Sequence, residues 1–296
     1  ANGFVTNVPQ YAVLRFIAGV GLAGELGAAI TLVAEILPKE KRGYGTAIVA
    51  GVGLSGAVLA GLIADHIPWN QAYILGGVFG LLLLFLRMGI LESELFHLAR
   101  VEKVNRGDVR LILFSKVRMI RYLACIAVGV PIWYAVGILV TFSPEIGKAL
   151  AVDGTIHSGR AIMYCYGGIA LGDLLSGFLS QIFANRKKIV LVFIVGLGIL
   201  SLSILLGKGI QVQSFYHLAF FLGIFTGYWA VFVTIAAEQF GTNLRATVTT
   251  SVPNFVRGSV VPMTMAFRAL SHSTDIVTSA LVVGVSAVSL AFVAPL

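Results

Sequence analysis

Long apolar segments occupy most of this sequence, and they restrict its possible folds more than any other feature. A helix needs about 20 apolar residues to cross the hydrocarbon core of a bilayer, and nine segments of about that length follow one another along the 296 residues. Charged residues make up only 11% of the chain, against about 25% in soluble domains. The sequence therefore predicts an all-α polytopic membrane protein with nine transmembrane helices, and it excludes a soluble enzyme, a disordered chain and a disulfide scaffold. The predicted spans are 8–37, 45–67, 71–90, 119–141, 158–183, 189–206, 216–237, 247–270 and 276–296.

The charged residues divide the chain and orient it. A polar stretch separates the third span from the fourth, so we expect two helical units, 1–91 and 119–296, joined by a linker at 92–118. If the first helix enters from outside, fourteen Lys and Arg residues fall in inner loops and four in outer loops. Because such basic loops stay in the cytoplasm, we expect a multi-pass protein of the bacterial inner membrane with a cytoplasmic linker. The net charge of +8 then requires no nucleic acid partner.

Two loops repeat one pattern. Glu35 is followed seven residues later by Arg42 in the loop after the first span, and Glu238 is followed by Arg245 at the same spacing after the seventh span. The offset is 203 residues, or six helices. Internal repeats of this kind are typical of secondary transporters, whose substrate sites lie near the midplane between the repeats. The alternative is coincidence, because Glu and Arg are common at helix ends.

A family resemblance rests on these loops and on two further stretches. Residues 15–25, an Arg followed by spaced glycines and a Gly-Glu step, resemble helix 4 of the major facilitator superfamily, and the Glu…Arg-Gly loop that follows is similar to its next loop. The Gly-Glu step is similar to the metabolite:proton symporter branch. Residues 177–188 resemble the superfamily's Gly-x-Leu-Ala-Asp…Arg-Arg loop, with Gln181 in place of Asp.

This resemblance implies a place for the chain in a fold of twelve helices. The chain begins just before helix 4 in this reading, so three helices precede Ala1. Residues 1–91 are then helices 4–6 of the N-terminal six-helix bundle, and residues 119–296 are helices 7–12 of the C-terminal bundle.

The resemblance also implies a function. A member of that branch is a secondary active transporter, which favours proton-coupled uptake of a small organic anion or zwitterionic metabolite by alternating access. We expect a monomer whose partners are the substrate, protons and the lipid bilayer, with no cofactor and no metal ion. The alternatives are a proton-driven exporter of the drug or siderophore type, and a transport-inactive receptor or scaffold of the same fold.

Three ionisable side chains inside the first and fifth apolar spans are candidates for proton coupling: Glu25, Asp173 and Arg15. An ionisable residue at the centre of a membrane helix costs about 2.5–3.5 kcal/mol on insertion scales, so it is seldom kept without a role. Glu25 or Asp173 would carry the proton, and Arg15 would tune a partner carboxylate. The structural alternatives are an interhelical hydrogen bond for Glu25, a contact beside the gate for Asp173 and snorkelling of Arg15 to the interface.

Arg257 is the main candidate for substrate binding because it lies well inside the eighth span. Its charge is permanent and needs a carboxylate, which either Asp173 or an anionic substrate could supply. The other candidates are a polar residue and several aromatic residues that could hydrogen-bond a solute or stack on it, with helix packing as the alternative. They are Asn254, Trp133, Tyr134, Tyr164, Tyr228 and Trp229.

Residues at the inner helix ends are predicted to gate the transporter rather than to bind its substrate. These are Glu35, Arg42, Glu238, Arg245, Gly177 and Arg186. Gly53, Ala57 and Gly61 recur every four residues, a spacing that lets helices approach closely. Pro131 and Pro253 are predicted to kink their helices.

Overall fold

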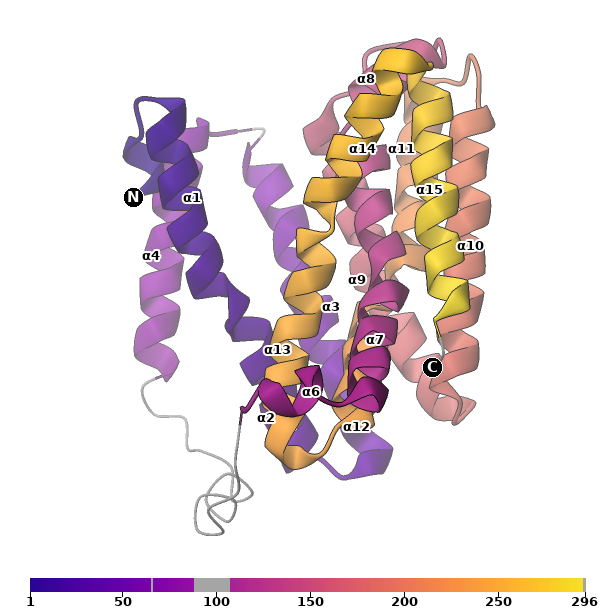
Figure 1. Cartoon of the computed structure of the whole chain (residues 1–296). Coiled ribbons are helices and arrows are strands. Elements are labelled where there is room, and N and C mark those ends of the chain that lie inside the picture. Colours follow the sequence, from indigo (N-terminus) through magenta and orange to yellow (C-terminus); the bar gives the residue numbers. More distant parts are fainter. Residues whose placement is uncertain (65, 88–106, 295–296) are drawn as a thin grey trace.

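The computed structural model describes residues 1–64, 66–87 and 107–294, and most of them are helical (Figure 1). In chain order the elements are η1 (Asn2–Phe4), α1 (Val8–Ala23), α2 (Glu25–Ile36), α3 (Lys39–Ala64), α4 (Trp69–Arg87), α6 (Arg110–Leu113), α7 (Lys116–Tyr134), the π-helical segment η2 (Ala135–Val140), α8 (Ser143–Ala149), α9 (Ser158–Ile182), α10 (Arg186–Leu206), α11 (Val212–Thr226), α12 (Trp229–Gln239), α13 (Thr242–Gly258), α14 (Val260–Ser273) and α15 (Ile276–Val293).

The predicted spans appear as helices. In the part of the chain that the structure describes, seven helical stretches are long and apolar enough to cross a membrane, and each matches a predicted span. The other two predicted spans, 8–37 and 247–270, are each built from two shorter helices, α1 with α2 and α13 with α14. Such a chain is an all-α polytopic membrane protein, as the sequence predicts.

Several helices begin at residues suited to that position. The side chains of Asn7 and Asn185 accept the backbone N–H groups of Gln10 and Lys188, and thereby cap α1 and α10. Asp275 caps α15 in the same way, accepting the backbone N–H and the hydroxyl of Thr278. These short polar side chains satisfy N–H groups that have no partner inside the helix.

Four helical spans are interrupted. The first breaks between α1 and α2 at Gly24, and α13 gives way to α14 at Ser259. Pro131 lies inside α7, which continues as the π-helix η2 four residues later. The break between α11 and α12 covers Gly227 and Tyr228 and falls within a single apolar span, Val212–Gln239. Breaks inside a membrane span are tolerated only where other protein groups satisfy the freed backbone.

Helices α3 and α9 pack along most of their length through small residues. An added Cβ on Gly43 would touch the side chain of Gln181, one on Gly51 would touch Leu174, and one on Gly61 would touch Met163. The predicted stripe is therefore only partly right, because a Cβ on Gly53 would meet nothing within 4 Å. A four-residue spacing occurs on more than one face of α3, and the spacing alone does not select the face that packs.

Glycines also bring α9 and α11 together at a very close crossing. An added Cβ on Gly168 would collide with the carbonyl oxygen of Phe220, and one on Gly172 with that of Ile224. In the opposite direction, a Cβ on Gly223 would collide with the carbonyl oxygen of Cys165. Because the neighbours are backbone atoms, the two helix backbones touch directly, and this crossing lies immediately before the break between α11 and α12.

Figure 1 shows how the helices assemble. Helices α7 to α15 form one bundle, α3 lies against α9, and α2 lies beside α13, whereas α1 and α4 stand apart from that bundle. We call one end of the molecule the α6 end, because α6 lies there with the α2–α3, α9–α10 and α12–α13 connections. The division at 1–91 and 119–296 stays a prediction, and most of the predicted linker lies outside the described residues.

Candidate functional site

Arg257 lies in the interior of the helical assembly on the last turn of α13. Its guanidinium is placed over the ring of Trp229, 5.2 Å from the ring centroid. Trp229 is the first residue of α12 and is 6% exposed. A cation over the face of a Trp ring is stabilised by the ring quadrupole, so the two side chains form a cationic platform at the start of α12.

The surroundings of Arg257 contain little negative charge. Tyr166 of α9 is close enough to interact with the guanidinium electrostatically. No carboxylate among the described residues forms an ion pair with Arg257. In particular, Asp173 does not supply the partner considered from the sequence, because it forms no ion pair with Arg257 and its Oδ1 atom accepts the Ala230 N–H instead.

Asn254 lies one helical turn before Arg257 and connects α13 to the break at Gly24. Its Nδ2 group donates to the carbonyl oxygen of Ala23, 2.8 Å away, and to that of Thr250 in its own helix, 2.7 Å away. Glu25 opens α2 directly after this break and is exposed. The structure thus brings Asn254 and Glu25 to one region, where α13 meets the α1–α2 break.

Asp173 of α9 is completely buried and faces the start of α12. Its Oδ1 atom accepts the backbone N–H of Ala230 at 3.0 Å, and the N–H of Trp229 is also directed at this carboxyl. Its Oδ2 atom is buried and has no hydrogen-bond partner among the described residues. A buried carboxylate normally has all its oxygens hydrogen-bonded, so Oδ2 is a position at which a proton can reside.

The other predicted aromatic residues occupy different places. Tyr134 and Tyr228 are 1% and 0% exposed, and their hydroxyls donate to the carbonyl oxygens of Ala280 and Val128, both at 2.9 Å. These two side chains therefore tie helices of the bundle together rather than face a cavity. The indole nitrogen of Trp133 is buried without a hydrogen-bond partner in the described chain.

Tyr164 and Arg15 lie away from Arg257. Tyr164 stacks on Tyr216 with ring centroids 5.4 Å apart, near the beginnings of α9 and α11. Arg15 is exposed on α1, and its guanidinium lies 6.0 Å from the centroid of the Tyr11 ring. The structure does not bring either residue together with Asp173 or Arg257.

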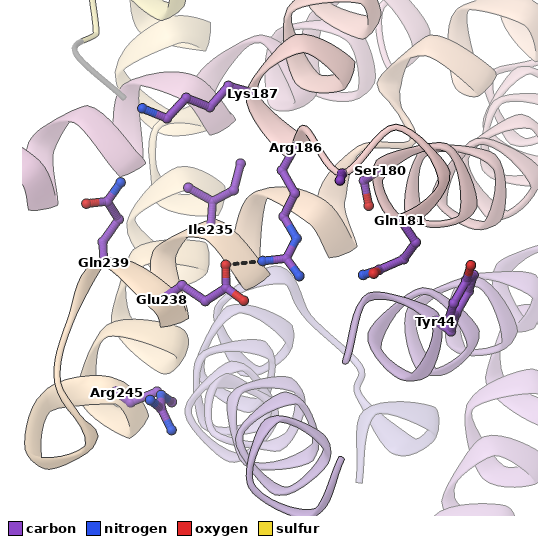
Figure 2. Close-up of a pocket in the computed structure, with 10 residues that line it drawn as sticks. Tyr44, Ser180, Gln181, Arg186, Lys187, Ile235, Glu238, Gln239 and Arg245 are labelled. Carbon is purple, nitrogen blue, oxygen red and sulfur yellow. Dashed lines mark hydrogen bonds and ion pairs between the residues drawn. The ribbon is translucent and has the colours of Figure 1, made fainter. Parts of the chain in front are cut away.

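A cavity of about 900 Å³ opens at the α6 end and contains several predicted gating residues. Figure 2 shows the ion pair between Arg186 and Glu238, with Gln181 and Tyr44 to the right of Arg186 in this view. The ion pair connects the first residue of α10 with the last turn of α12. The cavity is lined by Tyr44, Ser180, Gln181, Ala184, Arg186, Lys187, Ile235, Glu238, Gln239 and Arg245.

The remaining gating candidates lie around this cavity. Arg245 donates from Nε to the carbonyl oxygen of Ala237 at 3.3 Å, and Gly177 packs against Ala47 of α3. The side chains of Glu35 and Arg42 lie outside what the structure describes. The predicted first-half counterpart of the Glu238–Arg245 pattern therefore stays a prediction.

Comparison with known proteins identifies the family. The sequence pattern of the Major Facilitator Superfamily matches residues 1–273 of this chain. The chain belongs to the Major Facilitator Superfamily. The family assignment made from the helix-4 pattern and the 177–188 loop is thus confirmed, and with it the class of transporter rather than enzyme.

Relatives within the Major Facilitator Superfamily are transporters of small organic compounds. NiaP of Bacillus subtilis (strain 168), named as a candidate niacin/nicotinamide transporter, is 27% identical over 92% of this chain and 70% of its own length. The sialic acid transporter NanX of Escherichia coli (strain K12) is 26% identical over 66% of this chain and 47% of its own length. The 4-hydroxybenzoate transporter PcaK of Pseudomonas putida is 36% identical over 38% of this chain and 25% of its own length. This chain therefore aligns with only part of each relative.

Two contacts of this superfamily member could not be read from the sequence. The fifth span offers Tyr164 and Tyr166 alike as cavity aromatics, and only the structure shows that Tyr166 is the one beside Arg257. The hydroxyls of Thr46 in α3 and Thr234 in α12 lie 3.1 Å apart, and both side chains are buried. Threonine is common in helices, and only the packing of α3 on α12 gives this pair its meaning.

Proposed function

We propose that this protein carries a small organic anion across the membrane by alternating access, with protons driving its uptake. The observation that carries the proposal is the position of Arg257, whose half-buried guanidinium lies on the Trp229 ring without a carboxylate partner in the described chain. A planar guanidinium binds a carboxylate through two parallel hydrogen bonds. The names of two relatives specify niacin/nicotinamide and 4-hydroxybenzoate. The two carboxylates among these compounds, niacin and 4-hydroxybenzoate, support an anion with an aromatic ring.

Magnitudes favour an anion at Arg257 over a purely structural cation–π pair. An Arg at the centre of a membrane helix costs about 2.5–3.5 kcal/mol on insertion scales. A cation–π contact returns about 0.5–2 kcal/mol, so stacking on Trp229 offsets only part of the cost. A charge-assisted, bidentate contact with a substrate carboxylate supplies the remainder.

Asp173 is our candidate for the residue that takes up the transported proton. It is fully buried, and its Oδ2 atom has no hydrogen-bond partner in the described chain. Charged and neutral forms of such a carboxyl differ strongly in their preference for water and for the protein interior. Glu25 stays the second candidate, because it lies beside the Asn254 contact at the α1–α2 break.

Alternating access requires one end of the protein to close while the other opens. We assign the α6 end to the cytoplasmic side of a bacterial inner membrane on the basis of its basic loops. The Arg186–Glu238 pair and the contacts of α2 with α13 would hold this end closed. We further propose that the protein works as a monomer.

Transport by the protein in proteoliposomes tests this function. With labelled niacin and 4-hydroxybenzoate as probes, we expect accumulation driven by an inward proton gradient and at least a tenfold loss of probe binding in Arg257→Ala, a factor equivalent to about 1.4 kcal/mol. Accumulation driven only by the opposite gradient would instead support the exporter. Normal probe binding by Arg257→Ala would remove Arg257 from the site, and movement of neither probe would support the transport-inactive alternative.

A further inference from the structure

The break in the span Val212–Gln239 creates a helix N-terminus in the interior of the protein. Helix α11 ends at Thr226 and α12 begins at Trp229, so the first backbone N–H groups of α12 have no acceptor within their own helix. Tyr228 is the N-cap residue of α12, and its side chain does not accept a hydrogen bond from these N–H groups. In a membrane interior each such group costs several kcal/mol unless another protein group accepts it.

Asp173 provides this acceptor from the neighbouring helix. Its Oδ1 atom accepts the Ala230 N–H at 3.0 Å, while its Oδ2 atom is left without a partner in the described chain. The backbones of α9 and the α11–α12 joint are in close contact here, since an added Cβ on Gly227 would lie 2.6 Å from the backbone nitrogen of Asp173. The carboxyl therefore has one fixed oxygen and one oxygen that can accept a proton.

No charged side chain among the described residues forms an ion pair with Asp173. The described charged and titratable side chains on α3, α10 and α12 cluster at the α6 end, and those on α11 lie toward the opposite end. On α13 the charged residue beside the start of α12 is Arg257, and its guanidinium lies over the Trp229 ring. These groups are Lys41 and Tyr44 on α3, Glu145 and Lys148 on α8, Arg186, Lys187 and Lys188 on α10, Glu238 on α12, Tyr216 and His217 on α11, Arg245 on α13, and Arg160, Tyr164, Cys165 and Tyr166 on α9 itself. The hydroxyl of Tyr228, in the α11–α12 joint, donates to the Val128 carbonyl oxygen.

Trp229 lies between Asp173 and Arg257, with its backbone next to the first and its ring next to the second. Its backbone opens the helix that Asp173 caps, and its ring carries the Arg257 guanidinium. The next residue back, Tyr228, is fixed by its hydrogen bond to the Val128 carbonyl oxygen. A change at Asp173 is therefore passed on to Trp229 rather than taken up by movement of the Tyr228 side chain.

We propose that Trp229 couples proton binding at Asp173 to anion binding at Arg257. An ionised Asp173 accepts the N–H groups at the start of α12 more strongly than a protonated one, because charge-assisted hydrogen bonds are about twice as strong as neutral ones. Protonation loosens the first turn of α12 and changes the position of the Trp229 ring under Arg257. This coupling rests on the proposed function, because it assumes that Arg257 binds the anion.

The fluorescence of Trp229 tests the first half of this coupling without any substrate. The sequence contains three tryptophans, so Trp69→Phe combined with Trp133→Phe leaves Trp229 as the reporter. We expect its emission to follow a single protonation step in a pH titration and to lose this step in Asp173→Asn, which keeps an oxygen acceptor for the Ala230 N–H. The matched control Asp153→Asn, in an exposed loop, should keep the step. An emission that does not change with pH, or that changes equally in Asp173→Asn, would overturn the proposal.

Addition of 4-hydroxybenzoate tests the second half. Two sites coupled through Trp229 must influence each other equally, so saturating probe should change the proton affinity at Asp173 about fivefold or more, the lower range of measured couplings. Arg257→Gln should abolish this change and leave the protonation step itself intact. If the step depends on Asp173 but no probe changes it, the anion assignment of Arg257 is what fails.

A second variant addresses the role of the Trp229 ring directly. Trp229→Leu removes the aromatic platform, so we expect probe affinity that no longer depends on pH, with partial recovery in Trp229→Phe. Probe binding to Trp229→Leu that keeps the full pH dependence of the natural protein would show that Asp173 and Arg257 communicate by another path, and would also overturn the proposal.

Discussion

Replacement of Gly227 by alanine is expected to separate α9 from the α11–α12 joint. The new Cβ would lie 2.6 Å from the backbone nitrogen of Asp173 and from two backbone atoms of Gly172, whereas ordinary contacts begin near 3.4 Å. Backbone atoms cannot rotate away, so the helices must move apart by about 0.8 Å. The Ala230–Asp173 hydrogen bond, now 3.0 Å long, would then exceed the normal range of 2.7–3.2 Å.

Two costs combine in this variant. Overpacking of a tight contact costs about 1–3 kcal/mol, and a hydrogen bond to a charged group contributes about 1.5–3 kcal/mol. Because the two effects share one displacement, we expect a loss of about 3 kcal/mol rather than their full sum. One kcal/mol shifts the unfolding midpoint of a chain of 150–250 residues by about 2–4 °C, so in this somewhat longer chain the midpoint should fall by about 6 °C.

A thiol-reactive dye provides the assay, because both cysteines, Cys125 and Cys165, are buried in the folded protein. Their reaction on heating reports unfolding of α7 and α9. The matched control is Gly53→Ala, whose Cβ would meet nothing within 4 Å and which should be neutral or stabilising by up to about 1 kcal/mol. Equal midpoints for Gly227→Ala and Gly53→Ala would refute the claim that α9 and the joint are in direct backbone contact.

Three further predictions follow from the same structure. Arg257→Lys should weaken probe binding about tenfold or more in an equilibrium binding assay, because a lysine cannot form the planar, two-pronged contact; unchanged affinity would contradict a bidentate site. The Arg186–Glu238 pair is partly exposed, with side chains 19% and 37% accessible, so a double-mutant cycle with glutamines should give a coupling of about 1 kcal/mol or less, and a larger value would mean that the gate is a major source of stability. Hydrogen bonds from Thr278 lower the pKa of Asp275 below its usual value, so the capped start of α15 should be stable above about pH 4 and should lose this support as the pH falls through the lowered pKa. Amide exchange at Thr278 should accelerate in acid in the natural protein but not in Asp275→Asn, and identical acid profiles would exclude the cap as the cause.

The positions of the membrane spans could be predicted from sequence because hydrophobicity acts residue by residue. The interruptions were less accessible. Pro253 was expected to kink its helix, yet it lies inside α13, and the break comes at Ser259. Proline can stay in a helix when neighbouring groups satisfy the freed carbonyl, so the site of a break depends on tertiary packing.

The candidate site shows the same limit. Asp173 and Arg257 stand out in the sequence because charges are rare in apolar segments, and in the structure Asp173 is buried and Arg257 is half-buried. Their partners could not be foreseen, since Asp173 meets a backbone N–H group 57 residues later and Arg257 meets an aromatic ring on α12. Tyr134 and Tyr228 look equally suitable in sequence, but their hydroxyls are satisfied by backbone carbonyls of neighbouring helices.

The Thr46–Thr234 contact has a consequence for how α3 and α12 can part. Each hydroxyl lies within hydrogen-bond distance of its partner and also of a carbonyl in its own helix, that of Gly43 for Thr46 and that of Ala230 for Thr234. A hydroxyl has a single proton to donate, so when the helices separate each threonine can turn that proton to its own backbone. Each threonine therefore keeps a hydrogen-bond acceptor when the contact between them is broken. These two helices can separate and come together repeatedly without leaving a buried hydroxyl unpaired.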